Sequence, residues 1–199
     1  MMRWFYRFMF WLRGWKVDKN LPPEIKKCIV VAAPHTSNWD YWYLIAAFSI
    51  LKLRMRVTIK KEWTQFPYGF ITRPFGAIPV DRSPKTPDAP RPSLVEAMIH
   101  LFDNEKELIL VVTPEGSRGK RNEWKTGFYH VAQGAKVPIC LGYVDYKTKT
   151  AGIHKVIYPT DIERDMSEMM AFYQNVTPLF PAKFSIDTRY PPTETQLEN

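Results

Sequence analysis

Apolar positions along the chain gather in short runs separated by polar turns, and these runs predict strands and helices in alternation. Runs with the length of buried strands occupy residues 28–33, 55–60, 107–116, 137–146 and 153–159. Runs with helical spacing occupy residues 38–51, 92–104, 125–135 and 165–176. Because strands and helices take turns, the pattern predicts an α/β fold with a mostly parallel central sheet flanked by helices.

The domain organisation follows from where this alternation starts and stops. Residues 22–185 contain all the predicted elements except a helix at the amino terminus, and no internal repeat or linker divides them. We therefore expect a single domain over residues 22–185. The polar, proline-bearing residues 186–199 are expected to form a mobile tail.

Residues 1–17 predict an amphipathic helix that lies in a membrane interface. Its longest uncharged apolar run covers residues 8–12, far short of the roughly 20 residues that a membrane span requires. On a helical wheel tryptophan and phenylalanine share one arc and arginine the opposite side, although Phe10 intrudes on the basic side. The predicted interface residues are Trp4, Phe8, Trp11, Trp15, Arg3, Arg7 and Arg13. Packing of this helix on the core is the alternative.

The net charge of +8 indicates an anionic partner, which can be a nucleic acid, an anionic membrane, or a phosphorylated or coenzyme A substrate. The densest aromatic and basic stretch is the terminal amphipathic helix, so we do not expect a nucleic-acid partner. Cys28 and Cys140 lie inside apolar runs and are expected to be buried free thiols in a reducing compartment. The four histidines are scattered, so no metal site is expected.

Three polar clusters follow predicted strands, where open α/β sheets place their sites. In the first, PHTSNWD, a neutral His35 imidazole can take a proton from a hydroxyl while Asp40 orients the ring. Taken alone, Asp40 is as readily explained as a first-turn acid favoured by the helix dipole.

The other two clusters are also ambiguous when each is taken alone. FGAIPVDR places Gly76 six residues before Arg82. VVTPEGSRG runs from a buried strand into Glu115, Gly116, Ser117 and Arg118, where the glycine permits close backbone approach and the arginine suits phosphate or carboxylate. Glu115 can pair with that arginine or bind a substrate hydroxyl, and a surface turn with an ion pair is the alternative.

Taken together and in this order, the clusters resemble the sequence blocks of the lysophospholipid (glycerol-phosphate) acyltransferase superfamily, of the bacterial 1-acyl-glycerol-3-phosphate acyltransferase type. HTSNWD resembles the H-x-x-x-x-D block, GAIPVDR the second block and TPEGSR the third. The apolar residues 137–139 resemble the fourth block, and WKTG at residues 124–127 resembles the F-K-x-G that follows the third. The chain departs from the family at Thr113, a usual phenylalanine, and at Gly119, a common serine.

The resemblance implies an enzyme that transfers a fatty acyl group from acyl-CoA or acyl-carrier protein to the hydroxyl of a lysophospholipid such as lysophosphatidic acid. His35 is then the general base and Asp40 its orienting partner, with no acyl-enzyme and no cofactor. The implied acceptor and phosphate site is Arg82, Glu115, Gly116, Ser117 and Arg118, supported by Gly76 and Lys125.

The departures leave the acceptor open. A lyso-amino-acid lipid is one alternative, because an arginine accepts a carboxylate as readily as a phosphate. A non-catalytic lipid-binding protein of the same fold is another. With the amino-terminal helix, the resemblance predicts a peripheral protein at the cytoplasmic face of a membrane.

Overall fold

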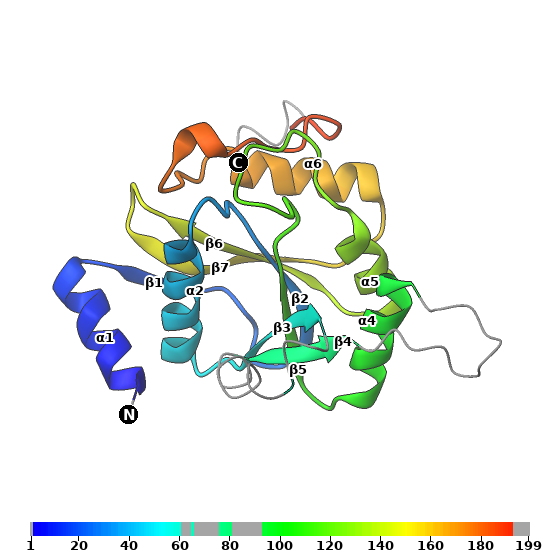
Figure 1. Ribbon diagram of the computed structural model, residues 1–199, viewed down its shortest axis with the longest axis horizontal. Coiled ribbons are helices and arrows are strands. Elements are labelled where there is room, and N and C mark those ends of the chain that lie inside the picture. Colours follow the sequence, from blue (N-terminus) through cyan, green and yellow to red (C-terminus); the bar gives the residue numbers. More distant parts are fainter. Residues whose placement is uncertain (1, 61–64, 66–75, 81–92, 193–199) are drawn as a thin grey trace.

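The computed structural model describes residues 2–60, 65, 76–80 and 93–192 (Figure 1). Within them, seven strands form one sheet in the order β1-β7-β6-β2-β5-β3-β4. The strands are β1 (Lys16–Lys19), β2 (Lys27–Ala32), β3 (Met55–Lys60), β4 (Ala77–Val80), β5 (Leu108–Val112), β6 (Ile139–Asp145) and β7 (Thr150–Ile157). All neighbouring strands are parallel except β6 and β7, so the predicted α/β fold with a mostly parallel sheet is confirmed.

Helices cover both faces of this sheet. They are α1 (Met2–Arg13), α2 (Asn38–Leu51), α4 (Leu94–Asn104), α5 (Gly127–Ala135) and α6 (Ile162–Tyr173). The helices α4, α5 and α6 pack on one face, whereas α2 packs on the other with α1 outside it (Figure 1). Because α2 lies between α1 and the sheet, it is apolar around most of its circumference.

The central strands are buried on both faces, which explains their continuous apolar runs. In β2, Ile29 and Val31 point into the core under α4, α5 and α6, while Cys28 and Val30 point into the core under α2. Both cysteines are buried and free. This alternation fixes the register of the strand, because a slip by one residue would exchange the two sets of side chains.

The predicted boundary of the amino-terminal helix at residue 17 is wrong. The helix ends at Arg13, where Gly14 adopts a left-handed conformation with φ 69°. The chain then turns inward and forms β1, which pairs with β7 at the sheet edge. A strand this short and polar shows no clear periodicity, so the pattern did not indicate it.

The prediction of a mobile tail from residue 186 is also wrong for its first residues. Asp187 is fully buried, and its carboxylate accepts the Trp124 amide at 2.9 Å. Arg189 donates to the same carboxylate at 2.7 Å and to the Trp124 carbonyl at 2.6 Å. These bonds hold the carboxy-terminal segment on the domain. Residues 193–199 lie outside the described residues.

Candidate active site

The loop between β2 and α2 carries His35 at the carboxyl end of the central strands. Ser37 is the N-cap of α2, and its hydroxyl accepts the Trp39 amide at 2.9 Å. Asp40 accepts the Ser37 amide at 2.7 Å in return, which completes a capping box. Asp40 is therefore a first-turn acid, and the same position brings it beside His35.

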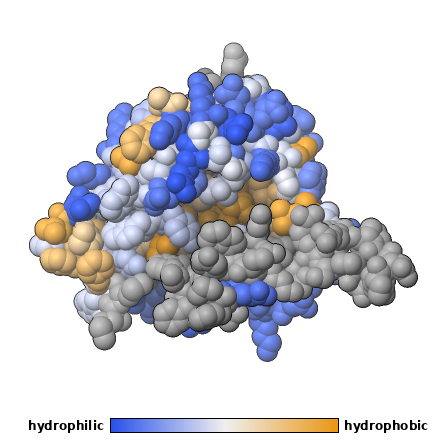
Figure 2. All heavy atoms as spheres, viewed as in Figure 1, coloured by the Kyte–Doolittle hydropathy of each residue, from blue (hydrophilic) through white to orange (hydrophobic). Residues whose placement is uncertain are grey.

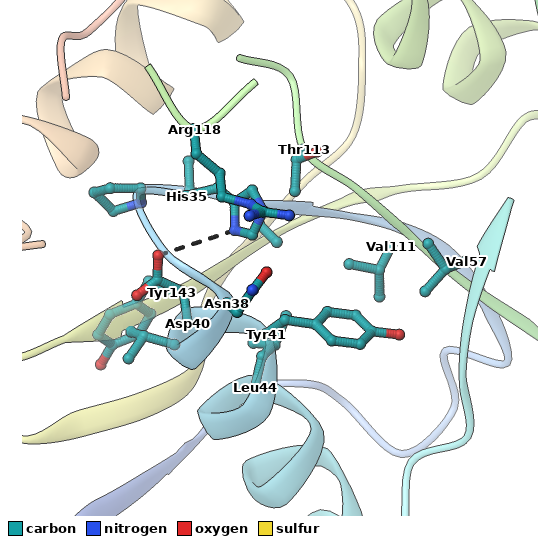
Figure 3. Close-up of a pocket in the computed structure, with 14 residues that line it drawn as sticks. His35, Asn38, Asp40, Tyr41, Leu44, Val57, Val111, Thr113, Arg118 and Tyr143 are labelled. Atoms are coloured by element: carbon teal, nitrogen blue, oxygen red, sulfur yellow. Dashed lines mark ion pairs between the residues drawn. The ribbon is translucent and has the colours of Figure 1, made fainter. Parts of the chain in front are cut away.

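The His35 imidazole and the Asp40 carboxylate face each other across this loop (Figure 3). Nδ1 of His35 lies 3.9 Å from Oδ2 of Asp40, close enough for electrostatic attraction but longer than a hydrogen bond. The same Oδ2 accepts the Thr36 amide at 2.7 Å, and Oδ1 accepts the Tyr146 hydroxyl at 2.8 Å. Several donors therefore keep the carboxylate beside the imidazole.

Glu115 holds the histidine loop from the other side. Its buried carboxylate accepts the His35 amide at 2.9 Å through Oε2 and at 3.2 Å through Oε1. Burial raises the pKa of Glu115 to about 7, although the bond from the His35 amide opposes this and the Asp40 charge adds to it. Glu115 thus contacts the backbone of His35, a partner that neither sequence hypothesis included.

Electrostatics favour a neutral His35 ring. Burial lowers the pKa of His35, the Asp40 charge opposes this by raising it, and the Arg118 charge lowers it further. An imidazole whose pKa lies below its ordinary value is unprotonated at neutral pH. It is then able to accept a proton.

Thr113 and Arg118 are the members of the third block that line the pocket. Arg118 lies on the loop after β5 and lines the same cavity as His35 (Figure 3). Ser117 instead accepts the Arg121 guanidinium at 3.2 Å. Gly116 has a φ of 67°, and a Cβ there would come within 2.9 Å of the Lys125 side chain. The chain thus places Lys125 against Gly116, whereas Gly116 and Ser117 do not line the cavity.

The described residues of the second block, 76–80, contribute β4 to the sheet. Gly76 precedes β4 with a φ of 87°, and a Cβ there would collide with the backbone carbonyl of Met55. Only glycine therefore fits where β4 approaches β3. Arg82 lies outside the described residues.

The cavity that His35 and Arg118 line has a volume of about 250 Å³. The sequence did not single out its apolar walls, which α2, β3, β5 and β6 supply. These wall residues include Tyr41, Leu44, Val57 and Val111, which Figure 3 labels, and also Val144. Asn38 and Tyr41 are three residues apart in a predicted helix, so the sequence could have indicated that they share one face. The strand residues carried none, because every apolar residue of a buried strand looks alike in sequence.

The amino-terminal helix exposes one aromatic face and packs the other on the domain. Trp4, Phe8 and Trp11 are 78%, 55% and 75% exposed, and hydrophobic side chains gather over α1 at the left edge of Figure 2. Tyr6 and Phe10 are buried against α2. One face of this helix therefore packs on the core, as the alternative hypothesis predicted. The other face is exposed, and its contact with a membrane stays a prediction.

Trp15 does not belong to the exposed face, and its prediction as an interface residue is wrong. It follows Gly14, is buried, and stacks on Tyr43 with ring centroids 3.9 Å apart. The arginines also contribute to packing. Arg3 donates to the Ile50 carbonyl at 3.2 Å, and Arg13 to the Tyr43 hydroxyl at 3.3 Å.

The sequence predicts neither a membrane-spanning helix nor a metal site, and both absences stay predictions. Among the described residues, no helix is long and apolar enough to cross a membrane. In the same part of the chain, no three or more histidine, cysteine, aspartate or glutamate side chains are grouped so that they could hold a metal ion.

Comparison with known proteins identifies the family. The family model described as Acyltransferase matches residues 16–141, which include the His35 loop, β5 and the loop that carries Arg118. The chain belongs to the acyltransferase family. It is therefore an acyltransferase enzyme, as the ordered sequence blocks predicted.

A solved structure is similar to this acyltransferase. It is described as the 1-acyl-sn-glycerophosphate (LPA) acyltransferase, PlsC, from Thermotoga maritima. The similarity covers 79% of this chain and 67% of that chain, with a TM-score of 0.49 and 16% sequence identity. The comparison with curated proteins returned no match.

Proposed function

We propose that this acyltransferase moves a fatty acyl group from an acyl thioester to the free hydroxyl of a lysophospholipid such as lysophosphatidic acid. One observation carries the proposal: His35 lies at the polar end of a cavity, between the Asp40 carboxylate and the Arg118 guanidinium. The rest of the cavity wall is mostly apolar, which suits an acyl chain.

In the proposed reaction His35 acts as the general base. Its Nδ1 faces Asp40, which favours the tautomer with the proton on Nδ1 and leaves Nε2 free to accept the acceptor's hydroxyl proton. The acceptor oxygen attacks the thioester carbonyl, and a carbon–oxygen bond forms. When the carbon–sulfur bond breaks, the leaving thiolate takes the proton back from His35. No acyl-enzyme forms in this scheme, and no cofactor is required.

The acceptor's phosphate is assigned to Arg118. In a lysophosphatidic acid the phosphate lies only a few bonds from the reacting hydroxyl, so its partner must lie close to His35. Arg118 is the cation that lines the cavity among the described residues. By resemblance to the second block, Arg82 would assist it, and Lys125 stands nearby against Gly116.

The donor is proposed to be acyl-CoA or acyl-carrier protein, both of which carry phosphate on a long pantetheine arm. That arm would place the phosphate outside the cavity. The loop after Arg118 offers exposed cations there, at Lys120, Arg121 and Lys125. None of these three forms an ion pair with a described residue, so their charge is available for an anionic partner.

We also propose that the enzyme works as a peripheral protein at the cytoplasmic face of a membrane. The exposed Trp4, Phe8 and Trp11 support this, because indole rings favour the headgroup layer. The acceptor and its diacylated product both reside in a bilayer. An enzyme docked there would not have to extract either one completely.

The test is to offer the purified enzyme radiolabelled acyl-CoA or acyl-carrier protein with a panel of lysolipids. We expect labelled diacylated product and free thiol in equal amounts, and only when a lysophospholipid is present. His35→Ala should lower turnover by at least about a hundredfold, because a positioned base contributes on that order. Full turnover in His35→Ala would exclude His35 as the base.

The same panel separates the second candidate acceptor. Arg118 can bind a carboxylate as well as a phosphate, which favours a lyso-amino-acid lipid as the alternative. Transfer to that lipid but not to lysophosphatidic acid would replace the proposed acceptor while leaving the reaction type unchanged.

A further inference from the structure

Tyr146, the residue directly after β6, contacts the Asp40 carboxylate through the oxygen that does not face His35. Its hydroxyl donates to Oδ1 at 2.8 Å, whereas Oδ2 lies toward Nδ1 of His35. Burial raises the pKa of Tyr146. The hydrogen bond to Asp40 and the negative charge of Asp40 raise it further. The phenol therefore remains a hydrogen-bond donor at any pH at which the protein is folded and active.

Two further aromatic rings fix the position of Tyr146. Trp15 meets its ring edge-on at an interplanar angle of 89° with centroids 5.4 Å apart, and Tyr43 does so at 86° and 5.7 Å. Trp15 and Tyr43 stack on each other. We call these three residues the aromatic bracket. The Tyr146 amide also donates to the Thr177 carbonyl at 2.9 Å, so its backbone and its ring are both held.

The aromatic bracket joins the amino-terminal helix to the site. The Trp15 amide donates to the Phe10 carbonyl at 2.7 Å, which ties Trp15 to the last turns of α1. Phe10 contacts the rings of both Trp15 and Tyr43, with centroids 5.9 and 6.0 Å apart. A continuous set of contacts therefore runs from α1 through Trp15 and Tyr146 to Asp40.

We infer that Tyr146 is a positioning residue for the acyl-transfer reaction, which it serves by orienting Asp40 toward His35 from a bracket anchored on α1. The inference rests on the proposed function, in which Asp40 stabilises the imidazolium that His35 becomes.

The physical reason lies in the competing donors around Asp40. The Thr36 and Ser37 amides, at the amino end of α2, both donate to Oδ2 at 2.7 Å. Without the Tyr146 hydroxyl, Oδ1 keeps only a long contact of 3.5 Å from the Ser37 hydroxyl among the described donors. The carboxylate can then rotate so that its two oxygens share these amides. Oδ2 would then move away from Nδ1 of His35. The imidazolium would be less well stabilised, both at equilibrium and in the transition state.

The test is Tyr146→Phe, which removes the hydroxyl and keeps the ring in the bracket. We expect kcat to fall about tenfold with KM nearly unchanged, as for the loss of one hydrogen bond to a charged group. The charged groups that face His35 are Asp40, Arg118 and the Glu115 carboxylate on its amide. Because Asp40 raises the pKa of His35, its displacement should move the acidic limb of the kcat/KM profile to lower pH.

Tyr129→Phe is the matched control. Tyr129 is buried and donates to a buried carboxylate, that of Asp165, at 2.7 Å, but it lies between α5 and α6 and does not line the cavity. We expect its kcat and pH profile to match the wild type. A Tyr146→Phe enzyme with wild-type kcat, or with an unmoved or raised acidic limb, would overturn the inference.

The link to α1 is tested by a double-mutant cycle. Trp15→Leu, or the milder Trp15→Phe if the first fails to fold, should lower kcat severalfold by loosening the bracket. In the Tyr146→Phe background the same substitution should lower kcat no further. Additive losses would show that Trp15 acts without Tyr146 and would overturn the link.

The outcomes also separate this inference from the proposed function. An active His35→Ala enzyme would remove the general base and with it the basis of both. An inactive His35→Ala enzyme together with a wild-type Tyr146→Phe enzyme would overturn only the role of Tyr146.

Discussion

At the residue scale, the site is organised by two carboxylates with different roles. Asp40 faces the His35 ring and accepts two amides at the amino terminus of α2. Glu115 is buried and accepts the His35 amide through both oxygens. Burial disfavours the charged form of Glu115 and raises the pKa of this carboxyl above the ordinary value of a glutamate.

The raised pKa of Glu115 predicts how the stability of the fold depends on pH. The pKa of Glu115 is raised to about 7 in the folded chain, above its unfolded value, so its ionisation destabilises the fold as pH rises through that range. Glu115→Gln keeps an oxygen for the His35 amide and cannot ionise. We expect the variant to match the wild type near pH 4 and to exceed it by about 3 kcal/mol at pH 8.

Urea unfolding at the two pH values measures this. Glu107→Gln, which alters a carboxylate whose side chain is 68% exposed, is the control and should show no comparable pH-dependent gain. A constant difference between Glu115→Gln and the wild type would mean that folding does not raise the pKa of Glu115.

At the element scale, α1 has two apolar faces with separate roles. Tyr6 and Phe10 contribute to the core, so deleting the helix would damage the domain as well as any membrane contact. Trp4 and Trp11 are mostly exposed, and substituting them alone leaves the core intact.

We expect the Trp4→Ala, Trp11→Ala double variant to bind anionic phospholipid vesicles at least about tenfold more weakly, because it loses two indole rings from the interface. Thermal stability should be unchanged, and so should turnover of a short-chain soluble acceptor. Co-sedimentation with vesicles gives the measurement. Tyr158→Ala, at a residue 65% exposed beyond β7, is the control. Equal vesicle binding by all variants would exclude Trp4 and Trp11 as membrane contacts.

At the scale of the whole molecule, the carboxy-terminal segment closes over the loop that follows the third block. Asp187 binds the Trp124 amide, and Arg189 binds both Asp187 and the Trp124 carbonyl. Trp124 directly precedes Lys125, which packs on Gly116 next to Glu115. The end of the domain is thus connected through a few contacts to the residue that holds His35.

Asp187→Ala should lower the free energy of unfolding by about 3 kcal/mol at pH 7, because it leaves the Trp124 amide and Arg189 without their buried acceptor. Burial alone would raise the pKa of Asp187, but the bonds from Arg189 and Trp124 hold it below its ordinary value. The Asp187 carboxylate therefore contributes to the free energy of unfolding at neutral pH, and this contribution is lost in acid. The difference between the variant and the wild type should shrink below about pH 4.

Urea unfolding at pH 7 and pH 3 measures that difference. The control is Glu123→Gln, which removes an exposed carboxylate 4.0 Å from Arg189 and should change stability by less than about 0.5 kcal/mol. A loss in Asp187→Ala no larger than in this control would mean that the carboxy-terminal segment is not held by Asp187.

The sequence by itself determined the order of strands and helices from residue 28 onward except for β4, because every other element is long enough to show its own period. The four residues of β4 are too few to show one. The sequence also indicated the family, since four short blocks occur in the expected order. The structure agrees on the α/β class and brings His35, Asp40, Glu115 and Arg118 together at the ends of β2 and β5. Local chemistry was sufficient there, because a strand end, an N-cap and a glycine turn are each encoded by neighbouring residues.

Only the tertiary structure decided which distant residues complete the site and which face of α1 is exposed. Tyr146 reaches Asp40 across 106 positions of sequence. Trp15 turns inward because the helix ends at Arg13, four residues before the predicted boundary, and Gly14 follows in a left-handed conformation. The carboxy-terminal segment is likewise held by the buried Asp187 carboxylate, which accepts the Trp124 amide 63 positions away. Such contacts arise from the packing of separate elements, and no periodicity within one element records them.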